Sequence, residues 1–357
     1  MTHILAVGTA VPEQVVRQSE ARLFAQEFFK EEFKDMHRLL QVFERSKIEK
    51  RHFCMPSSWF EKKVSFSEKN KLYQEQGLTL GTKAVEKCLQ KAGLSAQDID
   101  GIVFVSSTGI ATPSLDMYFA NLLGLKAEVR RMPLWGLGCC GGAVGLSRAA
   151  ELAKATPGKN ILLLTLELCG LTFMHSDRSK SNLIATALFA DGAAAALLSQ
   201  ESNDTKESRT IVQAGPTILD WQSHYWPESL DVMGWDLTDD GLQVVFSRHI
   251  PSLVKKEIKN IVEPFISRHK LTFDQIDFLI AHPGGLKVLD AYEEALGLEY
   301  EKTELSREIL CQYGNMSSAT VLFVLEETMK REPKKGSYGL LTALGPGFCS
   351  ELLLVQW

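Results

Sequence analysis

The chain has 357 residues, of which 45% are hydrophobic and 23% are charged, and its formal net charge at pH 7 is -5. This length predicts about two domain-sized units with a large core, and the composition excludes global disorder. The small negative charge gives no general reason to expect a nucleic acid or an anionic membrane as a partner. Any anionic ligand must therefore be bound by a local cluster of basic residues.

The seven cysteines show no C-x-x-C spacing. An odd number of cysteines in a long chain argues against a disulfide framework, and their spacing argues against a zinc ribbon, so no metal is expected. The segment Met1–Gly8 has no basic region typical of a signal peptide, and apolar runs such as Ile161–Leu166 are far shorter than the roughly 20 residues that span a bilayer. We expect a soluble, cytoplasmic protein with reduced thiols.

The first half of the chain has the pattern of an α/β protein. Ile4–Val7 is predicted to be a strand, and residues 17–50 are polar with helical character. Thr79–Ala92 has apolar residues at helical spacing and is followed by Gly93, which predicts a helix ending there. The apolar, β-branched run Ile102–Val105 is typical of a buried parallel strand.

Cys139 is the first candidate for chemistry. It lies in a glycine-rich segment just before a predicted helix, Gly141–Ala153. A helix N-terminus or a nearby imidazolium can lower a thiol pKa from about 8.5 to roughly 3.5–7.5, so together with His282 it would give a nucleophile charged at neutral pH. The alternative is that Cys139 and Cys140 are small buried hydrophobic residues.

A repeated pattern links the two halves of the chain. The phrase Leu94–Val105 recurs as Leu271–Ala281, after a helical segment over Val254–His269. Gly138-Cys139 recurs as Gly314-Asn315 at nearly the same offset, close to half the chain length. Each pair precedes an amphipathic helix, a turn rich in Gly and Lys, and an apolar strand. The sequence therefore predicts two copies of one α/β unit, although a chance match of one strand phrase is the alternative.

This repeat predicts the domain organisation. The first unit covers residues 1–200 and carries Cys139, and the second covers residues 210–357 and carries His282 and Asn315. The polar stretch 199–209 is the expected boundary. Cys139 and Asn315 would then occupy equivalent helix starts, one from each half, and could converge on a shared site.

His282 and Asn315 complete a set of groups suited to thioester chemistry. His282 ends the apolar strand Phe278–Ala281 and is followed by Pro-Gly-Gly. Loops at the carboxyl ends of strands are where α/β proteins place ligands. Thiolate attack on a thioester needs an imidazole partner and a donor for the developing oxyanion, and an asparagine amide is such a donor. Taken singly, each residue could instead be structural, since Gly-Asn is a common turn.

Three segments carry a resemblance to a known family: Gly138–Ala143, Ile280–Gly285 and Tyr313–Ala319. They resemble the three signatures of type III polyketide synthases, the chalcone synthase-like branch of the thiolase superfamily. Leu188–Ala194 and Leu344–Phe348 resemble two further blocks of the same family. The resemblance implies an α/β, thiolase-like αβαβα layered fold made of two duplicated halves, and a homodimer.

The resemblance also implies an activity and its residues. Cys139 would take a starter acyl group from coenzyme A as a thioester. His282 and Asn315 would hold the thioester carbonyl of malonyl-CoA while carbon dioxide leaves. No cofactor is implied, because acyl-CoA and malonyl-CoA are substrates. By the same resemblance, the substrate pocket would include the following residues: Cys169, Thr172, Phe189, Val244 and Ser317.

Binding of the phosphates of coenzyme A needs local positive charge. Arg38 and Arg45 match two basic positions that contact CoA in the family, and Gly284 is a third CoA-binding candidate, whereas Gln41 stands at a further basic position. The alternative for this basic cluster is a solvated helical face.

Val244 stands where plant members carry a second gating phenylalanine, which opens space and removes an aromatic wall unless Phe246 or Trp235 refills it. An aliphatic pocket suits a fatty acyl chain. We therefore expect condensation of malonyl-CoA onto a long-chain acyl-CoA, giving alkylpyrones or alkylresorcinols.

Two alternatives remain. One is an enzyme like ketoacyl-ACP synthase III that stops after one condensation, and the other is a non-catalytic acyl-CoA-binding homologue. The His282-Pro-Gly-Gly motif argues against the first, and the retention of all three of Cys139, His282 and Asn315 argues against the second.

Overall fold

The structure is a computed structural model that describes residues 1–201 and 215–357. In the first range the strands are β1 (Thr2–Ala10), β2 (Gln14–Arg17), β3 (Lys50–Phe53), β4 (Ile99–Val105), β5 (Arg130–Leu134), β6 (Asn160–Leu168) and β7 (Asp191–Gln200). The helices there are α1 (Gln18–Phe28), α2 (Met36–Arg45), α3 (Phe66–Ala92), α4 (Leu115–Leu123), α5 (Gly141–Ala155) and α6 (Lys180–Leu188).

The second range continues with strands and helices in alternation. Its strands are β8 (Thr217–Tyr225), β9 (Met233–Thr238), β10 (Gly241–Phe246), β11 (Ile276–Ala281), β12 (Tyr338–Gly345) and β13 (Cys349–Gln356). Its helices are α7 (Ile250–Ser267), α8 (Leu286–Leu296), α9 (Glu304–Tyr313) and α10 (Thr320–Lys330). Most of the expected boundary, residues 199–209, lies outside the described residues.

The two halves share one strand topology. From its free edge inward, the first half runs β5-β4-β6-β7-β1, and the second runs β11-β12-β13-β8. β4 pairs with β6 in parallel, as β11 does with β12, and the next pairs inward are antiparallel in both halves. A short antiparallel pairing of β1 with β8, at Thr2 and His3, joins them into one nine-stranded sheet.

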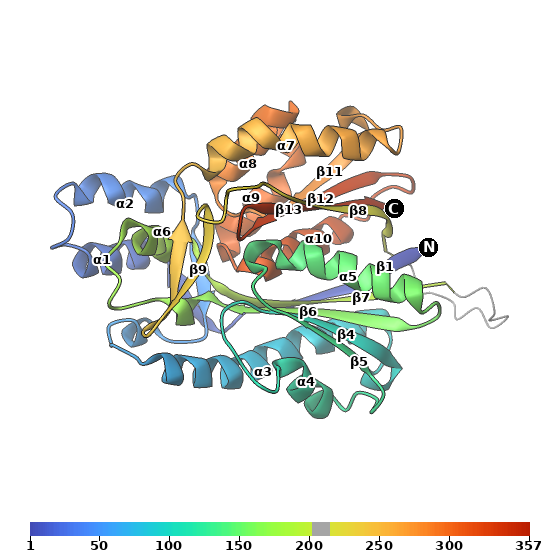
Figure 1. The fold of residues 1–357 in the computed structure, drawn as a ribbon, viewed down its shortest axis with the longest axis horizontal. Helices are drawn as coiled ribbons and strands as arrows, with labels where there is room; N and C mark the ends of the chain where they lie inside the picture. Colours follow the sequence, from blue (N-terminus) through green and yellow to red (C-terminus); the bar gives the residue numbers. More distant parts are fainter. Residues whose placement is uncertain (202–214) are drawn as a thin grey trace.

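Five layers result, as Figure 1 shows. α3 and α4 cover the outer face of the first-half strands, and α7 and α8 cover the outer face of the second-half strands. α5 and α10 lie between the two groups of strands and form the central layer. The predicted αβαβα fold with duplicated halves is confirmed.

The central layer brings the starts of α5 and α10 into contact. A Cβ added to Gly142 in α5 would lie 2.2 Å from the carbonyl oxygen of Ser318, so only glycine allows this approach. The buried face of α5 consists mostly of glycine and alanine, which lets both groups of strands pack closely against it. The fold thus places one segment from each half at a shared point.

The predicted elements differ from the observed ones mainly in length. The predicted helix Thr79–Ala92 is the last half of α3, which begins earlier because the Ser65 hydroxyl caps it by accepting from the Glu68 backbone N–H. Residues 17–50 form two helices, α1 and α2, between the strands β2 and β3 rather than one helical stretch. No helix in residues 1–201 or 215–357 is both long and apolar enough to cross a membrane.

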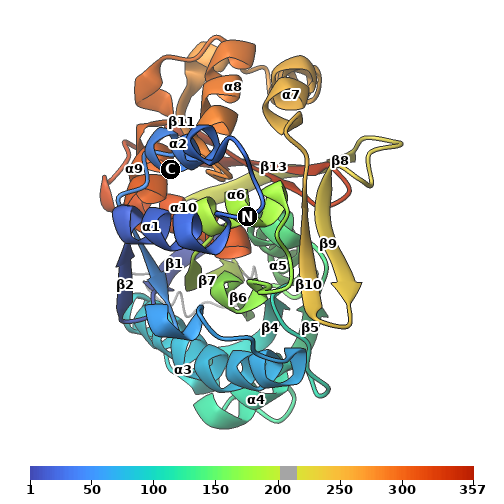
Figure 2. The same cartoon turned by 90° about the vertical axis from the view of Figure 1, so that its left-hand side faces the viewer.

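At one end of the layers, α1, α2 and α6 form a helical cap, with the β9–β10 hairpin beside it, as Figure 2 shows. α1 packs on both α2 and α6 through a cluster of buried apolar residues that includes Ala25, Phe43 and Leu183. This cap closes one side of the cavity described below.

Candidate active site

Cys139 lies in a short 3-10 turn, Gly138–Cys140, at the start of α5. Gly138 has a φ of 46°, a conformation that glycine adopts without strain, and its N–H donates to the hydroxyl of Ser107 at 3.0 Å. Cys139 is partly exposed, whereas Cys140 is fully buried. The turn therefore presents one thiol of the pair to the site and packs the other into the core.

Asn315 is held on both sides by the chain around Phe189. Its N–H donates to the Leu188 carbonyl, and its own carbonyl accepts from the Ala190 N–H, both at 2.9 Å. The side-chain Oδ1 accepts from the Ser317 N–H at 2.8 Å, which fixes the amide orientation. The Cys139 Sγ lies 3.9 Å from Oδ1 and 4.0 Å from Nδ2. The structure thus brings Cys139 and Asn315 together across the two halves.

His282 follows β11 and is fixed by its backbone N–H, which donates to the Thr342 carbonyl at 2.8 Å. Its ring is buried, and neither ring nitrogen has a hydrogen-bond partner among the described residues. Gly284 connects it to the amide: the Gly284 carbonyl accepts from Asn315 Nδ2 at 3.2 Å, and a Cβ added to Gly284 would lie 3.7 Å from His282 Nε2. Burial lowers the pKa of His282 to about 3, which keeps the imidazole neutral.

The surroundings of Cys139 do not favour the expected thiolate at neutral pH. Burial raises the pKa of the thiol to about 11, and the negative charge of Glu167 raises it further, while hydrogen bonds from Ser317 and Asn315 lower it less. Both the thiol and His282 are therefore neutral at rest.

Glu167 is a functional candidate that the sequence interpretation missed. It is fully buried in β6, where its Oε2 accepts from the Ser107 N–H at 3.0 Å and its Oε1 accepts from the Ser318 hydroxyl at 2.5 Å. Burial raises the pKa of this carboxyl to about 7. The signal that could have found it is an acidic residue inside an otherwise apolar strand.

The predicted equivalence of Cys139 and Asn315 is also wrong in register. α10 is preceded by the 3-10 turn Ser317–Ala319, and Ser317 has a φ of 48°, close to that of Gly138. Alignment of the two turns on these residues pairs Cys139 with Ser318. Asn315 lies before its turn, so the two residues converge without being structural counterparts.

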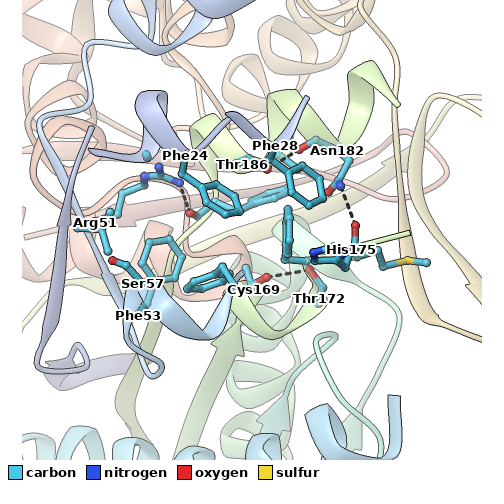
Figure 3. A pocket seen from close by; sticks show the side chains of 18 of the residues that line it. Phe24, Phe28, Arg51, Phe53, Ser57, Cys169, Thr172, His175, Asn182 and Thr186 are labelled. Carbon is cyan, nitrogen blue, oxygen red and sulfur yellow. Dashed lines mark hydrogen bonds between the residues drawn. The ribbon is translucent and has the colours of Figure 1, made fainter. Parts of the chain in front are cut away.

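A cavity of about 490 Å³ lies under the helical cap (Figure 3). Cys139, His282 and Asn315 do not line it, but its lining residue Phe189 pairs with Asn315. Its wall is largely aromatic, with contributions from α1, β3, the segment after β6, and the β9–β10 hairpin. The aromatic lining residues are Phe24, Phe28, Phe53, Phe60, Phe173, Phe189 and Trp235. Four of the five predicted pocket residues, Cys169, Thr172, Phe189 and Val244, line it, whereas Ser317 lies beside Cys139.

Trp235 supplies part of the wall that Val244 leaves open. The two residues face each other in the β9–β10 pairing, and the Trp235 ring lies 6.0 Å from the Phe189 ring, centroid to centroid. Phe246, the other residue that could have refilled the gap, packs against the second-half core instead. The cavity thus keeps an aromatic wall near Phe189, built from a different strand, and the expected aliphatic lining is wrong because Trp235 takes the place that Val244 leaves.

The predicted CoA-binding residues lie in two places. Arg38 and Arg45 are both exposed on α2, and neither forms an ion pair with another described residue. Gly284 lies next to Asn315 and His282 instead. The two places are near each other, because Ile48, just after α2, packs in the same buried cluster as Leu286, just after Gly284.

The fold and this site together define a class of protein. A cysteine at the start of a central helix contacts an asparagine from the other half of a duplicated αβαβα fold, and a buried histidine lies near that asparagine through Gly284. This arrangement is that of a condensing enzyme of the thiolase-like class. No group of three His, Cys, Asp or Glu side chains within the described ranges could hold a metal ion.

Comparison with known proteins identifies the family. The profile described as "Chalcone and stilbene synthases, N-terminal domain" matches residues 1–202, and the C-terminal domain profile of the same family matches residues 219–357. The chain therefore belongs to the chalcone and stilbene synthase family. It is a type III polyketide synthase and thus an acyltransferase, as the sequence predicted, and the family assignment disfavours the ketoacyl-ACP synthase III-like alternative.

Individual relatives agree with this assignment. The chain is 46% identical to a Bacillus subtilis (strain 168) protein named "Putative chalcone synthase", over 100% of this chain and 99% of that protein. It is 36% identical to the 1,3,6,8-tetrahydroxynaphthalene synthase of Streptomyces peucetius subsp. caesius, over 100% and 93%. The crystal structure of 1,3,6,8-tetrahydroxynaphthalene synthase from Streptomyces coelicolor A3(2), a bacterial type III polyketide synthase, has a TM-score of 0.92, 27% identity and 99% coverage of both chains.

Proposed function

We propose that this enzyme condenses malonyl-CoA onto a long-chain fatty acyl-CoA, held as a thioester on Cys139, and releases alkylpyrones or alkylresorcinols. The observation that carries the proposal is the cavity of about 490 Å³ with its mostly apolar wall, which reaches from Cys169 and Phe189 to α1. Burial of each methylene contributes about 0.8 kcal/mol, so an apolar cavity of this kind favours a long aliphatic starter. CoA thioesters are the substrates, and we propose no further cofactor.

Loading of the starter uses the Cys139–His282 pair. The sulfur attacks the thioester carbonyl while its proton passes to a ring nitrogen of His282, neither of which has a competing partner. The carbon–sulfur bond to coenzyme A breaks, and the imidazolium returns the proton to the departing thiolate. Because burial lowers the pKa of His282, its imidazolium is a strong acid that returns the proton readily.

Extension uses Asn315 as the donor to the malonyl thioester oxygen. The carboxylate leaves as carbon dioxide, and the electron pair of the broken carbon–carbon bond forms an enolate, whose oxygen Asn315 Nδ2 and the His282 ring would stabilise. The orientation of the Asn315 amide is fixed because its Oδ1 accepts a hydrogen bond from the Ser317 N–H, so Nδ2 needs little reorganisation to donate. The enolate carbon then attacks the acyl group on Cys139, which releases the Cys139 thiolate and leaves the elongated chain as a thioester of coenzyme A. For the next round the thiolate attacks this thioester, and coenzyme A leaves.

Coenzyme A would bind over α2. Arg38 and Arg45 present guanidinium groups that are exposed and unpaired among the described residues, and guanidinium groups bind phosphate well. Arg38→Gln is expected to raise KM for both CoA thioesters with little change in kcat, and Lys259→Gln, an exposed cation on α7, is the matched control.

We also propose a cytoplasmic homodimer. Large apolar side chains are exposed near the free edge strand β5, and they include Met117 and Leu122 on α4, together with Trp135. An exposed apolar patch beside an unpaired strand edge is a common feature of subunit interfaces. Light scattering on the purified protein should give twice the monomer mass of 39.7 kDa.

One experiment tests the proposed reaction. The enzyme is incubated with malonyl-CoA and saturated acyl-CoAs of increasing length, and products are identified by mass spectrometry. We expect kcat/KM to rise with chain length and the products to be alkylpyrones or alkylresorcinols. A higher rate with malonyl-CoA alone or with short starters would overturn the long-chain assignment.

A further inference from the structure

Arg51 is a buried cation in the apolar cavity. It lies in β3, is 1% exposed, and lines the cavity, where Figure 3 shows its guanidinium beside Phe24. Its Nη1 donates to the Phe189 carbonyl at 2.8 Å, whereas its Nε has no hydrogen-bond partner among the described residues. Part of its hydrogen-bonding capacity is therefore not used by the described residues.

No carboxylate in the described residues forms an ion pair with Arg51. Asp191 is close enough to raise the pKa of Arg51, but its two oxygens accept from the Gly170 and Cys54 N–H groups, and burial still lowers the pKa of Arg51 to about 9. A buried charge without a paired counterion is costly. A ligand oxygen would supply the missing acceptor.

The position of Arg51 relates it to the reacting chain. Gly314 has a φ of 71°, and a Cβ there would lie 2.7 Å from Arg51 Cγ, so the arginine stem packs directly on the residue before Asn315. Phe189, whose carbonyl Arg51 binds, pairs with Asn315 on the other side. The guanidinium thus lies on the side of the cavity where Phe189 pairs with Asn315.

We propose that Arg51 binds a ketone or enolate oxygen of the growing poly-β-keto chain. The proposal rests on the proposed function, in which the chain that is extended on Cys139 enters this cavity. A saturated starter carries no oxygen beyond its thioester, so it gains nothing from the guanidinium. Each extension adds two carbons and one ketone, so the growing chain carries a ketone on alternate carbons. The planar guanidinium of an arginine donates well to ketone and enolate oxygens. Arg51 therefore favours later extensions over the first.

The alternative is that Arg51 only tethers the Phe189 carbonyl. Lys69 offers a matched control for that role, because it is also a buried cation, and its Nζ donates to the carbonyl of Phe173, another residue of the cavity wall, at 2.6 Å. Lys69 itself does not line this cavity. A purely structural Arg51 should therefore behave like Lys69 on substitution.

The experiment compares two thioesters of equal chain length, an acyl-CoA and its 3-oxoacyl-CoA, as starters for full-length enzyme. The wild type should have the higher kcat/KM for the 3-oxo compound. In Arg51→Met this preference should fall about ten- to a hundredfold, the range for a hydrogen bond to a charged group, and products should shorten. Lys69→Met should leave the preference unchanged, and Cys139 loading by the plain acyl-CoA, measured on each variant, reports any general loss of activity.

Two results overturn the proposal: a wild type without preference for the 3-oxo thioester, or an Arg51→Met enzyme that handles both thioesters equally less well. Where Arg51→Met does not fold, Arg51→Lys carries the test, since it keeps the charge but loses the second donor, and an unchanged preference there overturns the proposal as well. The acyl-CoA and its 3-oxoacyl-CoA are compared at short and at long chain lengths. This comparison tests the long-chain starter and the Arg51 subsite separately. A preference that depends on Arg51 only at short lengths refutes the long-chain starter and retains the Arg51 subsite.

Discussion

The starts of α5 and α10 have the same backbone and carry different chemistry. Each helix begins with a 3-10 turn whose first residue has a positive φ, 46° at Gly138 and 48° at Ser317. The second residue of the turn is Cys139 in one half and Ser318 in the other. The cysteine is partly exposed to the site, whereas the serine is fully buried and donates to Glu167.

This difference shows how a duplicated fold divides one reaction between its halves. In the proposed mechanism, the first half supplies the nucleophile from inside its turn. The second half has no nucleophile at the matching position and places its amide, Asn315, just before the turn, where the Ser317 N–H orients it. Contact of Gly142 in α5 with Ser318 in the other turn then brings thiol and amide to about 4 Å. The backbone is shared between the halves, and only side chains assign the roles.

The largest expected effect separates the two turns directly. Cys139→Ala should abolish both acylation by acyl-CoA and product formation, because no other thiol at this turn is exposed to the site. Ser318→Ala, the same change at the matching position of the other half, should still load one acyl group. Intact-protein and peptide mass spectrometry locate the group. Acylation of Cys140, or activity in Cys139→Ala, would contradict this assignment of the nucleophile.

The second effect tests the role of the other half. Asn315→Ala should slow malonyl-CoA decarboxylation by about a hundred to a thousand fold, the usual cost of losing an oxyanion donor. Loading of Cys139 should persist, because it depends on the Cys139–His282 pair. Carbon dioxide release and acyl-enzyme mass, measured on the same preparation, give the two rates. If both fall equally, Asn315 supports the backbone at Phe189 and does not act on the substrate.

Much of the fold and part of the site could be predicted from the sequence. Apolar strands and glycine-ended helices depend on local pattern, so β4, α5 and the repeat in β11 were predictable. The register of the two turns was not predictable, because Gly138 and Ser317 share a φ value but not a residue type. Identity in sequence suggested Gly314 as the partner of Gly138, and only the backbone shows the shift.

Residues that act through burial were harder to predict. Arg51 is an ordinary charged residue in the sequence, and Glu167 differs only in standing inside a mostly apolar strand. The significance of both comes from neighbours far along the chain, such as Ser318 and Phe189. The state of the Cys139 thiol depends on the same burial, which outweighs the helix start that suggested a thiolate. Desolvation is a property of the packed molecule, so a local motif cannot reveal it.

The third prediction concerns Glu167, whose carboxyl bonds to Ser318 in one turn and to Ser107, which bonds to Gly138 in the other. Glu167 raises the pKa of Cys139 when it is ionised, and its own pKa is about 7. Glu167→Gln should therefore lower the thiol pKa and speed alkylation of Cys139 by iodoacetamide above pH 7. Below pH 7 the wild-type carboxyl is protonated, so the two rate profiles should converge. Glu86→Gln, an exposed site on α3, is the control, and parallel profiles for wild type and Glu167→Gln would rule out the coupling.

The smallest expected effect is a change in kcat/KM for each methylene of the starter, and it concerns the cavity. Here too the two halves contribute different residues. Phe189 comes from the first half, and Val244 and Trp235 come from the β9–β10 hairpin of the second. Val244→Phe should fill space beside Trp235 and shift the starter preference toward shorter acyl-CoAs. Each methylene excluded from the cavity forfeits about 0.8 kcal/mol, roughly fourfold in kcat/KM, so the change accumulates with length.

Val245→Phe provides the matched control for this change. Val245 is adjacent in β10 but does not line the cavity, because neighbouring residues of a strand point to opposite faces. Its chain-length profile should therefore superimpose on that of the wild type, while the profile of Val244→Phe moves to shorter chains. If both variants follow the wild type, Val244 does not limit the acyl path, and the aromatic pair of Phe189 and Trp235 must set its width.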